Sequence, residues 1–217
     1  MKIAFIFAHL DDESYGPLGT IARHVKQGDE VVVVSMCRGN RPGADVQGQR
    51  VHTFIEICDM LGVESIVQDQ SDTRMTRDET QFRVNKLIED LEPNVVYTHF
   101  NGDAHQDHRM LSECVLIACR PKPESTVKEL LMCELPAATE WAFGQFGDFK
   151  PNIFNDVTDL IELKQEALEM YETETYDYPD ARSVDSMKIL AAQRGKQCGV
   201  NYAEAFQLVF SLNRKIQ

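Results

Sequence analysis

Residues 3–13 read IAFIFAHLDDE, an apolar run that ends in a histidine and three acids. The apolar part does not alternate with polar residues, which predicts a strand buried on both faces of a parallel sheet. The polar cluster then falls at the carboxyl end of that strand, where open α/β sheets bind their ligands. His9 and Asp12 are three residues apart, so a tight turn can direct both to one point, whereas Asp11 must point elsewhere. An imidazole, a ligating carboxylate and a free carboxylate are the parts of a catalytic zinc site.

A second polar cluster, DAHQDH at residues 103–108, follows another strand-like run, NVVYTH at 94–99. It precedes a helical pattern that starts near Arg109. Two strand ends that carry histidine and aspartate can supply three protein ligands to one metal ion and leave a position for water. The residues alone do not choose between His105 and His108 as the third ligand, because the two lie three apart on one face.

The two motifs, AHLDDE at 8–13 and HQDH at 105–108, resemble those of the LmbE/PIG-L family of zinc-dependent N-acetylglucosaminyl deacetylases. That family usually has proline at the position of Leu10 and often at that of Gln106, but neither position supplies a ligand atom. Later segments also look like the family's sugar-modifying members, namely Glu140-Trp141, Pro151-Asn152, Lys164, Arg182-Ser183, Arg194-Gly195 and residues 202–206 (YAEAF).

The resemblance implies metal-assisted hydrolysis of an amide. It assigns a Zn²⁺ ion to His9, Asp12 and His108, although such ligands also accept other divalent metals. We expect Asp11 to be the general base, because it adjoins a ligand without sharing its direction and can face the reacting water. That role requires a pocket that holds the pKa of Asp11 above the value of a free aspartate.

Other acids and histidines near the motifs have expected roles as well. With His108 as the ligand, His105 is free to stabilise the oxyanion of the tetrahedral intermediate, most effectively when protonated. Asp107 is expected to hydrogen-bond a histidine and fix its tautomer. Asp69 and Asp72 lie on a strand-end loop, where solvent exposure is expected and a place in the site is the alternative.

Three residues are expected to bind substrate. Arg50 matches an arginine that the family places near substrate, although Thr53 stands where the family commonly has a glutamate. Arg182 is a second candidate, and Asp180 beside it replaces a histidine found in many relatives. The lone tryptophan, Trp141, can either stack on a sugar face or cover the edge of the core.

The chain carries a formal net charge of −13, which argues against nucleic acid or an anionic membrane as its main partner. An anionic substrate would need a local basic pocket, for which Arg38, Arg41 and Arg50 are candidates. The expected partner is a small N-acetylated sugar conjugate. The sequence leaves the oligomeric state open, with a homo-oligomer among the possibilities.

Strand-like runs and helical patterns alternate along the chain, which predicts one domain over residues 1–217 with an α/β, Rossmann-like fold. The sheet is expected to be mostly parallel, with helices on both faces. The spacing GxGxxG is missing, which disfavours a dinucleotide cofactor. The further expected strands are residues 29–37, 63–67, 128–135 and 152–157, and the expected helices begin near residues 18, 49, 79, 110, 158 and 183.

The six cysteines form no CxxC pair, as expected for free thiols in a reducing cytosol. The amino-terminal segment lacks the features of a cleavable signal peptide, and no apolar stretch approaches the roughly 20 residues of a membrane span. The protein is therefore expected to be cytoplasmic, without integral membrane association.

The leading hypothesis is a zinc-dependent N-deacetylase that acts on an N-acetylglucosamine-type conjugate. One alternative is a zinc amidase that cleaves a non-sugar or thiol-conjugate amide with the same residues. The other is a non-catalytic carbohydrate- or nucleotide-binding module that uses the metal structurally. The motifs themselves predict only a hydrolytic metal site, and the sugar follows from the resemblance.

Overall fold

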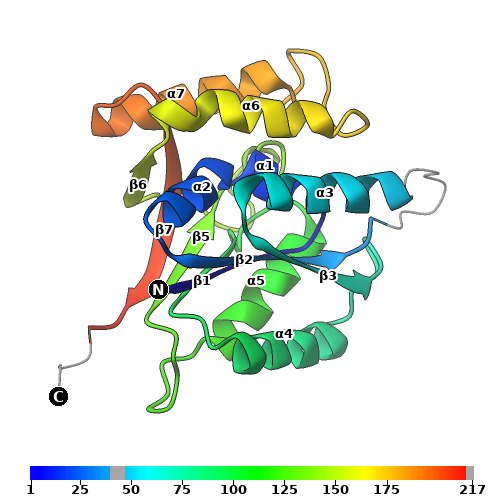
Figure 1. Ribbon diagram of the computed structural model, residues 1–217, viewed down its shortest axis with the longest axis vertical. Helices are drawn as coiled ribbons and strands as arrows, with labels where there is room; N and C mark the ends of the chain where they lie inside the picture. The colour runs from blue at the N-terminus through cyan, green and yellow to red at the C-terminus, as the bar shows by residue number, and fades with distance from the viewer. Residues whose placement is uncertain (40–46, 214–217) are drawn as a thin grey trace.

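The computed structural model describes residues 1–39 and 47–213. In that part of the chain, seven strands form one sheet in the order β3-β2-β1-β4-β5-β7-β6 (Figure 1). The first five strands in this order, β3, β2, β1, β4 and β5, pair in parallel. Strand β7 is antiparallel to both of its neighbours, β5 and β6. The expected mostly parallel α/β fold is confirmed. The strands are β1 (Lys2–Phe7), β2 (Glu30–Cys37), β3 (Glu64–Gln70), β4 (Val95–His99), β5 (Glu129–Cys133), β6 (Ile153–Asp156) and β7 (Ala203–Ser211).

Helices cover both faces of the sheet, as the sequence predicts. In Figure 1, α1, α2 and α3 lie on one side with α6 and α7 beyond them, and α4 and α5 lie on the other. No helix in the described ranges is long and apolar enough to cross a bilayer. The helices are α1 (Asp12–Tyr15), α2 (Leu18–Lys26), α3 (Gln47–Leu61), α4 (Arg77–Leu91), α5 (Gln106–Ala118), α6 (Ile161–Met170) and α7 (Val184–Cys198), with short 3₁₀ turns η1 (Glu140–Ala142) and η2 (Thr158–Leu160).

Strand β1 is central because its side chains serve two cores at once. Phe5 and Phe7 pack in the core beneath α2 and α3, whereas Ala4 and Ile6 pack in the core beneath α4 and α5. These four side chains are at most 1% exposed. Since full burial of a large apolar side chain contributes about 1.5–3 kcal/mol, both faces hold the strand in place. This two-sided burial is what the unbroken apolar run predicts.

The sheet order reverses between β1 and β4. Phe5 of β1 pairs with Val33 of β2 on one side and with Tyr97 of β4 on the other. The connections from β1 and β4 therefore leave the sheet in opposite directions, and a crevice opens at the carboxyl ends of these two strands. The segments with the two predicted motifs follow β1 and β4, so both lie at this crevice.

Helix α5 begins at Gln106, earlier than the pattern starting near Arg109 predicts. His105 caps it, because the His105 side chain accepts a hydrogen bond from the backbone N–H of Asp107 at 3.2 Å. The first turn of α5 consists of polar residues. The spacing of apolar residues therefore could not predict that the helix begins at Gln106. As a result, Asp107 and His108 lie in the first turn of α5.

Strand β7 was not expected from the strand pattern. Its Glu204 accepts hydrogen bonds from the N–H groups of Gly19 and Thr20 at 2.9 and 2.7 Å, so it caps the amino-terminal end of α2. Lys164 of α6 lies 2.7 Å from the same carboxylate. A Cβ atom at Gly19 would lie 2.6 Å from the Val157 side chain, so this contact requires glycine. Lys164 and Glu204 thus join the last strand to the first helices.

Candidate metal centre and active-site pocket

The turn after β1 sends two neighbouring acids in different directions. The backbone N–H of His9 donates to Oδ2 of Asp12 at 2.8 Å, which holds Asp12 beside the histidines. Asp11 adopts a left-handed backbone conformation with φ of 99°. Such a conformation costs of order 1–3 kcal/mol for a residue with a Cβ and is often found at functional sites. The turn is held further by the Asp11 N–H, which donates to Oε2 of Glu13 at 3.0 Å.

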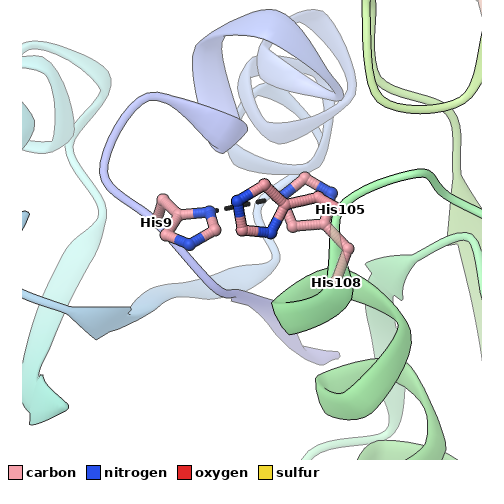
Figure 2. A group of neighbouring side chains, drawn as sticks. All are labelled: His9, His105 and His108. Carbon is pink, nitrogen blue, oxygen red and sulfur yellow. Dashed lines mark hydrogen bonds between the residues drawn. The ribbon is translucent and has the colours of Figure 1, made fainter. Parts of the chain in front are cut away.

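Donor atoms of three side chains from the two motifs lie close together. Nδ1 of His9 lies 3.2 Å from Nε2 of His108 and 3.5 Å from Oδ2 of Asp12. Nε2 of His108 lies 3.6 Å from Oδ1 of Asp12. Ligands that are 2.0–2.1 Å from a tetrahedral ion lie about 3.3 Å apart, so these donors have suitable separations. Figure 2 shows the imidazoles of His9 and His108 directed toward each other, with His105 beside them.

In His9 and His108, the ring nitrogen that is not among the donor atoms, here called the outer nitrogen, lies beside a carboxylate. Nε2 of His9 lies 3.3 Å from Asp107 and 3.2 Å from Asp72. Nδ1 of His108 lies 3.0 Å from Asp103, whose other oxygen accepts a hydrogen bond from Thr139 at 2.6 Å. An N–H directed at an outer carboxylate leaves the inner nitrogen unprotonated, which is the state a metal ion needs. The donor set therefore fits a divalent ion.

Another histidine, His99 at the end of β4, packs against the ring of His108. Its ring stacks on that of His108 with centroids 3.8 Å apart and planes 7° from parallel. Its Nε2 is 2.9 Å from the backbone N of Ala8 and 3.3 Å from Asp12. His99 is fully buried, so it fixes the position of the His108 ring from one side. His9, His105 and His108 form one group of side chains that could hold a metal ion, and Asp12, His99 and His108 form another.

Burial and pairing set the charges of these groups. Burial alone would raise the pKa of Asp12, but His108 and His99 hold that pKa well below its usual range. Burial and the neighbouring His99 hold the pKa of His108 well below 6.5. Burial would also lower the pKa of His9, yet its hydrogen bonds to Asp107 and two further carboxylates raise it well above 6.5. Asp12 is thus charged, as a carboxylate ligand must be, whereas His9 must lose a proton before it can bind a metal ion.

Asp11 lies outside the donor triad and contacts two arginines. Its Oδ2 is 2.6 Å from Nη2 of Arg182 and 3.3 Å from Nη2 of Arg50. Glu174 contacts the same two guanidinium groups, at 3.5 Å from Arg50 and 3.4 Å from Arg182. Burial raises the pKa of Asp11 even though both arginines oppose the rise. A general base at this position requires a raised pKa.

His105 has one nitrogen committed to its helix cap. Because its Nδ1 accepts from the N–H of Asp107, the proton of the neutral ring lies on Nε2. Burial and the nearby His9 lower the pKa of His105. The neutral ring can therefore donate a hydrogen bond from Nε2, and it does not need the positive charge that was expected to make it most effective.

A pocket of about 380 Å³ brings most of the predicted residues together. His9, Asp12 and His108 line it with Asp11, His105, Arg50, Arg182 and Trp141. Asp107 is 1% exposed and lies behind the lining, in contact with His9. Arg38 is exposed and does not line this pocket, and Arg41 lies outside the described residues.

Four further residues belong to the site although no role was predicted for them. Asp72 lines the pocket at 8% exposure, so the expectation of solvent exposure was wrong for it. Asp69 lies within β3 rather than on the loop that was expected, but it is exposed as expected and pairs with Arg83. The others are Asp103, His99 and Glu174. Asp103 and His99 do have a signal in the sequence, because one begins the second motif and the other ends a buried strand.

Residues 4–119, more than half of the chain, match the model of a protein family described as GlcNAc-PI de-N-acetylase, PIG-L. This span includes both motifs. The chain belongs to the PIG-L family. The resemblance inferred from residues 8–13 and 105–108 is thereby confirmed, and so is the class of enzyme, an N-deacetylase. PIG-L deacetylases depend on a metal ion, and this PIG-L chain has a candidate His/Asp group to bind it.

Curated relatives of this PIG-L chain are named as deacetylases. Diacetylchitobiose deacetylase of Thermococcus kodakarensis is 27% identical over 227 residues, which cover 96% of the chain and 83% of the relative. A probable N-acetyl-alpha-D-glucosaminyl L-malate deacetylase 2 of Bacillus anthracis is 24% identical over 184 residues, covering 78% and 79%. The structure of GalB, the 4-carboxy-2-hydroxymuconate hydratase of Pseudomonas putida KT2440, matches with a TM-score of 0.77 at 22% identity over the whole of both chains. At that identity the likeness concerns the fold alone.

Proposed function

We propose that this PIG-L chain removes the N-acetyl group from an N-acetylglucosamine-type amino sugar conjugate by means of a zinc-activated water molecule. The observation that carries the proposal is the approach of the His9, Asp12 and His108 donors within a pocket that also contains Asp11. The names of the relatives, which refer to diacetylchitobiose and to an N-acetylglucosaminyl malate, support a sugar substrate.

His9, Asp12 and His108 would hold the ion. Two imidazoles and one carboxylate suit zinc, and they also tolerate other divalent metals of the first row. When bound, the ion would lower the pKa of a water molecule and polarise the acetyl carbonyl. The partners of the outer nitrogens, Asp107 and Asp103, would keep both rings in the required tautomers.

Asp11 would act as the general base. It takes a proton from the attacking water as the new bond to the acetyl carbon forms. It then passes that proton to the sugar nitrogen as the C–N bond breaks, so that acetate and a free amine leave. The raised pKa of Asp11 favours both transfers, because a very weak base would not accept the proton and a strong one would not return it.

His105 would stabilise the charge that develops on the carbonyl oxygen. Its Nε2–H can donate to that oxygen while Nδ1 stays bound to the start of α5. A fixed donor in a buried site stabilises developing charge more than water does. Arg50 and Arg182 would orient Asp11, and Trp141, which also lines the pocket, would contact the sugar.

Residues 1–217 would act as one domain in this function. The supporting observation is that the pocket draws its lining from both ends of the chain, with His9 after the first strand and Arg182 before the last helix. Tyr15 joins these parts, because its hydroxyl lies 3.0 Å from the carbonyl oxygen of Glu174 and 2.8 Å from that of Arg182.

The test is acetate release from a panel of N-acetylated sugars and conjugates by the zinc-loaded protein. Asp11→Asn should lower the turnover by at least about 10²-fold while metal analysis finds zinc retained. Asp69→Asn is the matched control, because Asp69 is exposed and outside the pocket, and it should leave turnover unchanged. Full activity in Asp11→Asn would remove Asp11 from the mechanism. Release of acyl products other than acetate would favour an amidase, and sugar binding without any turnover would favour a binding module.

A further inference from the structure

We infer that the group attached to the amino sugar, the aglycone, is uncharged and presents a flat ring to the pocket. This inference rests on the proposed function and narrows its substrate class. It follows from two features of the described pocket lining, namely an excess of carboxylates over guanidinium groups and a set of apolar side chains. The protein should therefore prefer neutral conjugates to conjugates that carry a carboxylate or phosphate.

The cationic side chains of the pocket are already paired. Arg50 contacts Asp11 and Glu174, and it also donates to the carbonyl oxygen of Leu10 at 2.9 Å. Arg182 contacts the same two carboxylates, and its guanidinium group lies 4.8 Å from the centre of the Tyr15 ring. Neither arginine is a free cation that could neutralise an incoming anion.

The charges of the described lining leave no positive excess for an anion. Four carboxylates, those of Asp11, Asp12, Asp72 and Glu174, face two guanidinium groups. One divalent ion would balance the two extra negative charges and no more. A carboxylate or phosphate on the aglycone would therefore lose its water without gaining a counter-ion, and that loss is unfavourable. The acidic character of the whole chain, with a net charge of −13, adds to the repulsion.

Part of the described pocket lining is apolar. It consists of Trp141 and the loop residues Leu135, Pro136, Ala137 and Ala138, which we call the apolar wall. Trp141 is 53% exposed, so much of its indole ring is free to contact a ligand. Such a ring packs well against another flat ring, as in an aryl group or the apolar face of a pyranose.

The apolar wall is held at a fixed place relative to the metal donors. The N–H of Ala104, next to His105, donates to the carbonyl oxygen of Ala138 at 2.7 Å. Thr139 in the same loop donates to Asp103, the partner of His108. Because the wall and the histidines share these bonds, a ring seated on Trp141 lies at a defined position relative to the reacting amide.

The test uses two substrates that differ only in charge, phenyl and 4-carboxyphenyl glycosides of N-acetylglucosamine, with the methyl glycoside as reference. We expect kcat/KM to be at least about tenfold higher for the phenyl than for the 4-carboxyphenyl glycoside. Calorimetry should give the same order of binding affinity. We expect Trp141→Ala to reduce the ratio of kcat/KM for the phenyl glycoside to kcat/KM for the methyl glycoside by about tenfold. Trp141→Phe should retain most of the preference for the phenyl glycoside. Phe143→Ala is the control, since Phe143 is 79% exposed and does not line the pocket.

The outcomes separate this inference from the proposed function. Acetate release that favours the 4-carboxyphenyl glycoside, or that is equal for both, would overturn the inference while the deacetylase function stands. An unchanged phenyl-to-methyl ratio in Trp141→Ala would overturn the role of the indole ring. Binding in the expected order without release of acetate would support the inference and contradict the proposed reaction.

Discussion

Oδ2 of Asp103 lies 3.0 Å from Nδ1 of His108, on the side of the ring that faces away from the other metal donors. Both side chains are buried, and burial raises the pKa of Asp103 to about 8. A partner at this position fixes the tautomer and the orientation of the imidazole. The ligand geometry of His108 therefore depends on a residue outside the group of donors.

Replacing Asp103 should weaken metal binding without abolishing the fold. Asp103→Asn keeps the shape of the side chain, but with Oδ1 still accepting from Thr139 the new amide nitrogen faces His108 and cannot accept from its Nδ1–H. We expect the affinity for Zn²⁺ to fall about 10–100-fold, measured by competition with a chelator. Asp90→Asn, at an exposed position of α4, is the control and should bind zinc normally. An Asp103→Asn protein with unaltered zinc affinity would show that His108 needs no such partner.

Metal binding should release a proton from His9. Its raised pKa means that His9 is protonated near neutral pH in the metal-free protein, so Zn²⁺ must displace that proton. Affinity should therefore increase with pH, about tenfold per unit, until the pH exceeds the pKa of His9. Calorimetry in buffers of different ionisation enthalpy measures the released protons.

A substitution at Asp72 tests the cause of this pH dependence. Asp72→Asn removes one of the contacts that raise the pKa of His9, so the increase in affinity should end at a lower pH. Asp69→Asn, at an exposed residue near the end of β3, should leave the curve unchanged. Zinc affinity that does not vary with pH would contradict the expected protonation of His9.

The contact between Lys164 and Glu204 should contribute strongly to stability. Their side chains are 4% and 6% exposed, and their charged atoms are 2.7 Å apart. Loss of one partner from a buried ion pair costs about 3–5 kcal/mol, so Lys164→Met should lower the thermal midpoint by about 6–20 °C. Lys188→Met breaks a pair whose acid, Glu162, is 79% exposed, and it should have an effect below about 1 kcal/mol. Equal midpoints for the two variants would contradict this difference.

Cys198 should be the one thiol that reacts quickly in the folded protein. It is exposed, whereas the other five cysteines are buried. Burial also raises the pKa values of Cys37 and Cys119 to about 12, which suppresses the reactive thiolate. Labelling with a thiol reagent should give one fast group per native chain and six after denaturation. Cys198→Ser should remove the fast phase, and two or more fast thiols in the native protein would contradict the assignment.

The centre of the fold and the meeting of the two motifs could be predicted because their signals are local. The unbroken apolar run before His9 predicts a strand buried on both faces, and the strand indeed contributes to two cores. Parallel strands end at one edge of a sheet, so motifs after two of them were expected to meet. The choice between His105 and His108 required geometry, since their spacing is equivalent in the sequence. Nε2 of His108 is the one found near both His9 and Asp12.

The contacts that were missed depend on segments far apart in the chain. Glu174 reaches Arg50 only because the loop after α6 folds back over the start of the sheet. Asp72 lies in the polar segment after the edge strand β3, and the sequence of this segment resembles that of an exposed loop. The Asp72 side chain is buried because it contacts His9. Strand β7 pairs in the antiparallel direction, which no local pattern specifies. Tertiary contacts of this kind leave little trace in residue periodicity.

The bonds from Tyr15 to the backbone of Glu174 and Arg182 have a consequence for synthesis on the ribosome. The histidine-bearing turn emerges early, but the arginines that hold Asp11 are complete only after Arg182 has been translated. Asp11 therefore gains both of its arginine partners only after the two motifs have been translated. Catalytic competence would arrive late in translation, when β7 takes its place between β5 and β6.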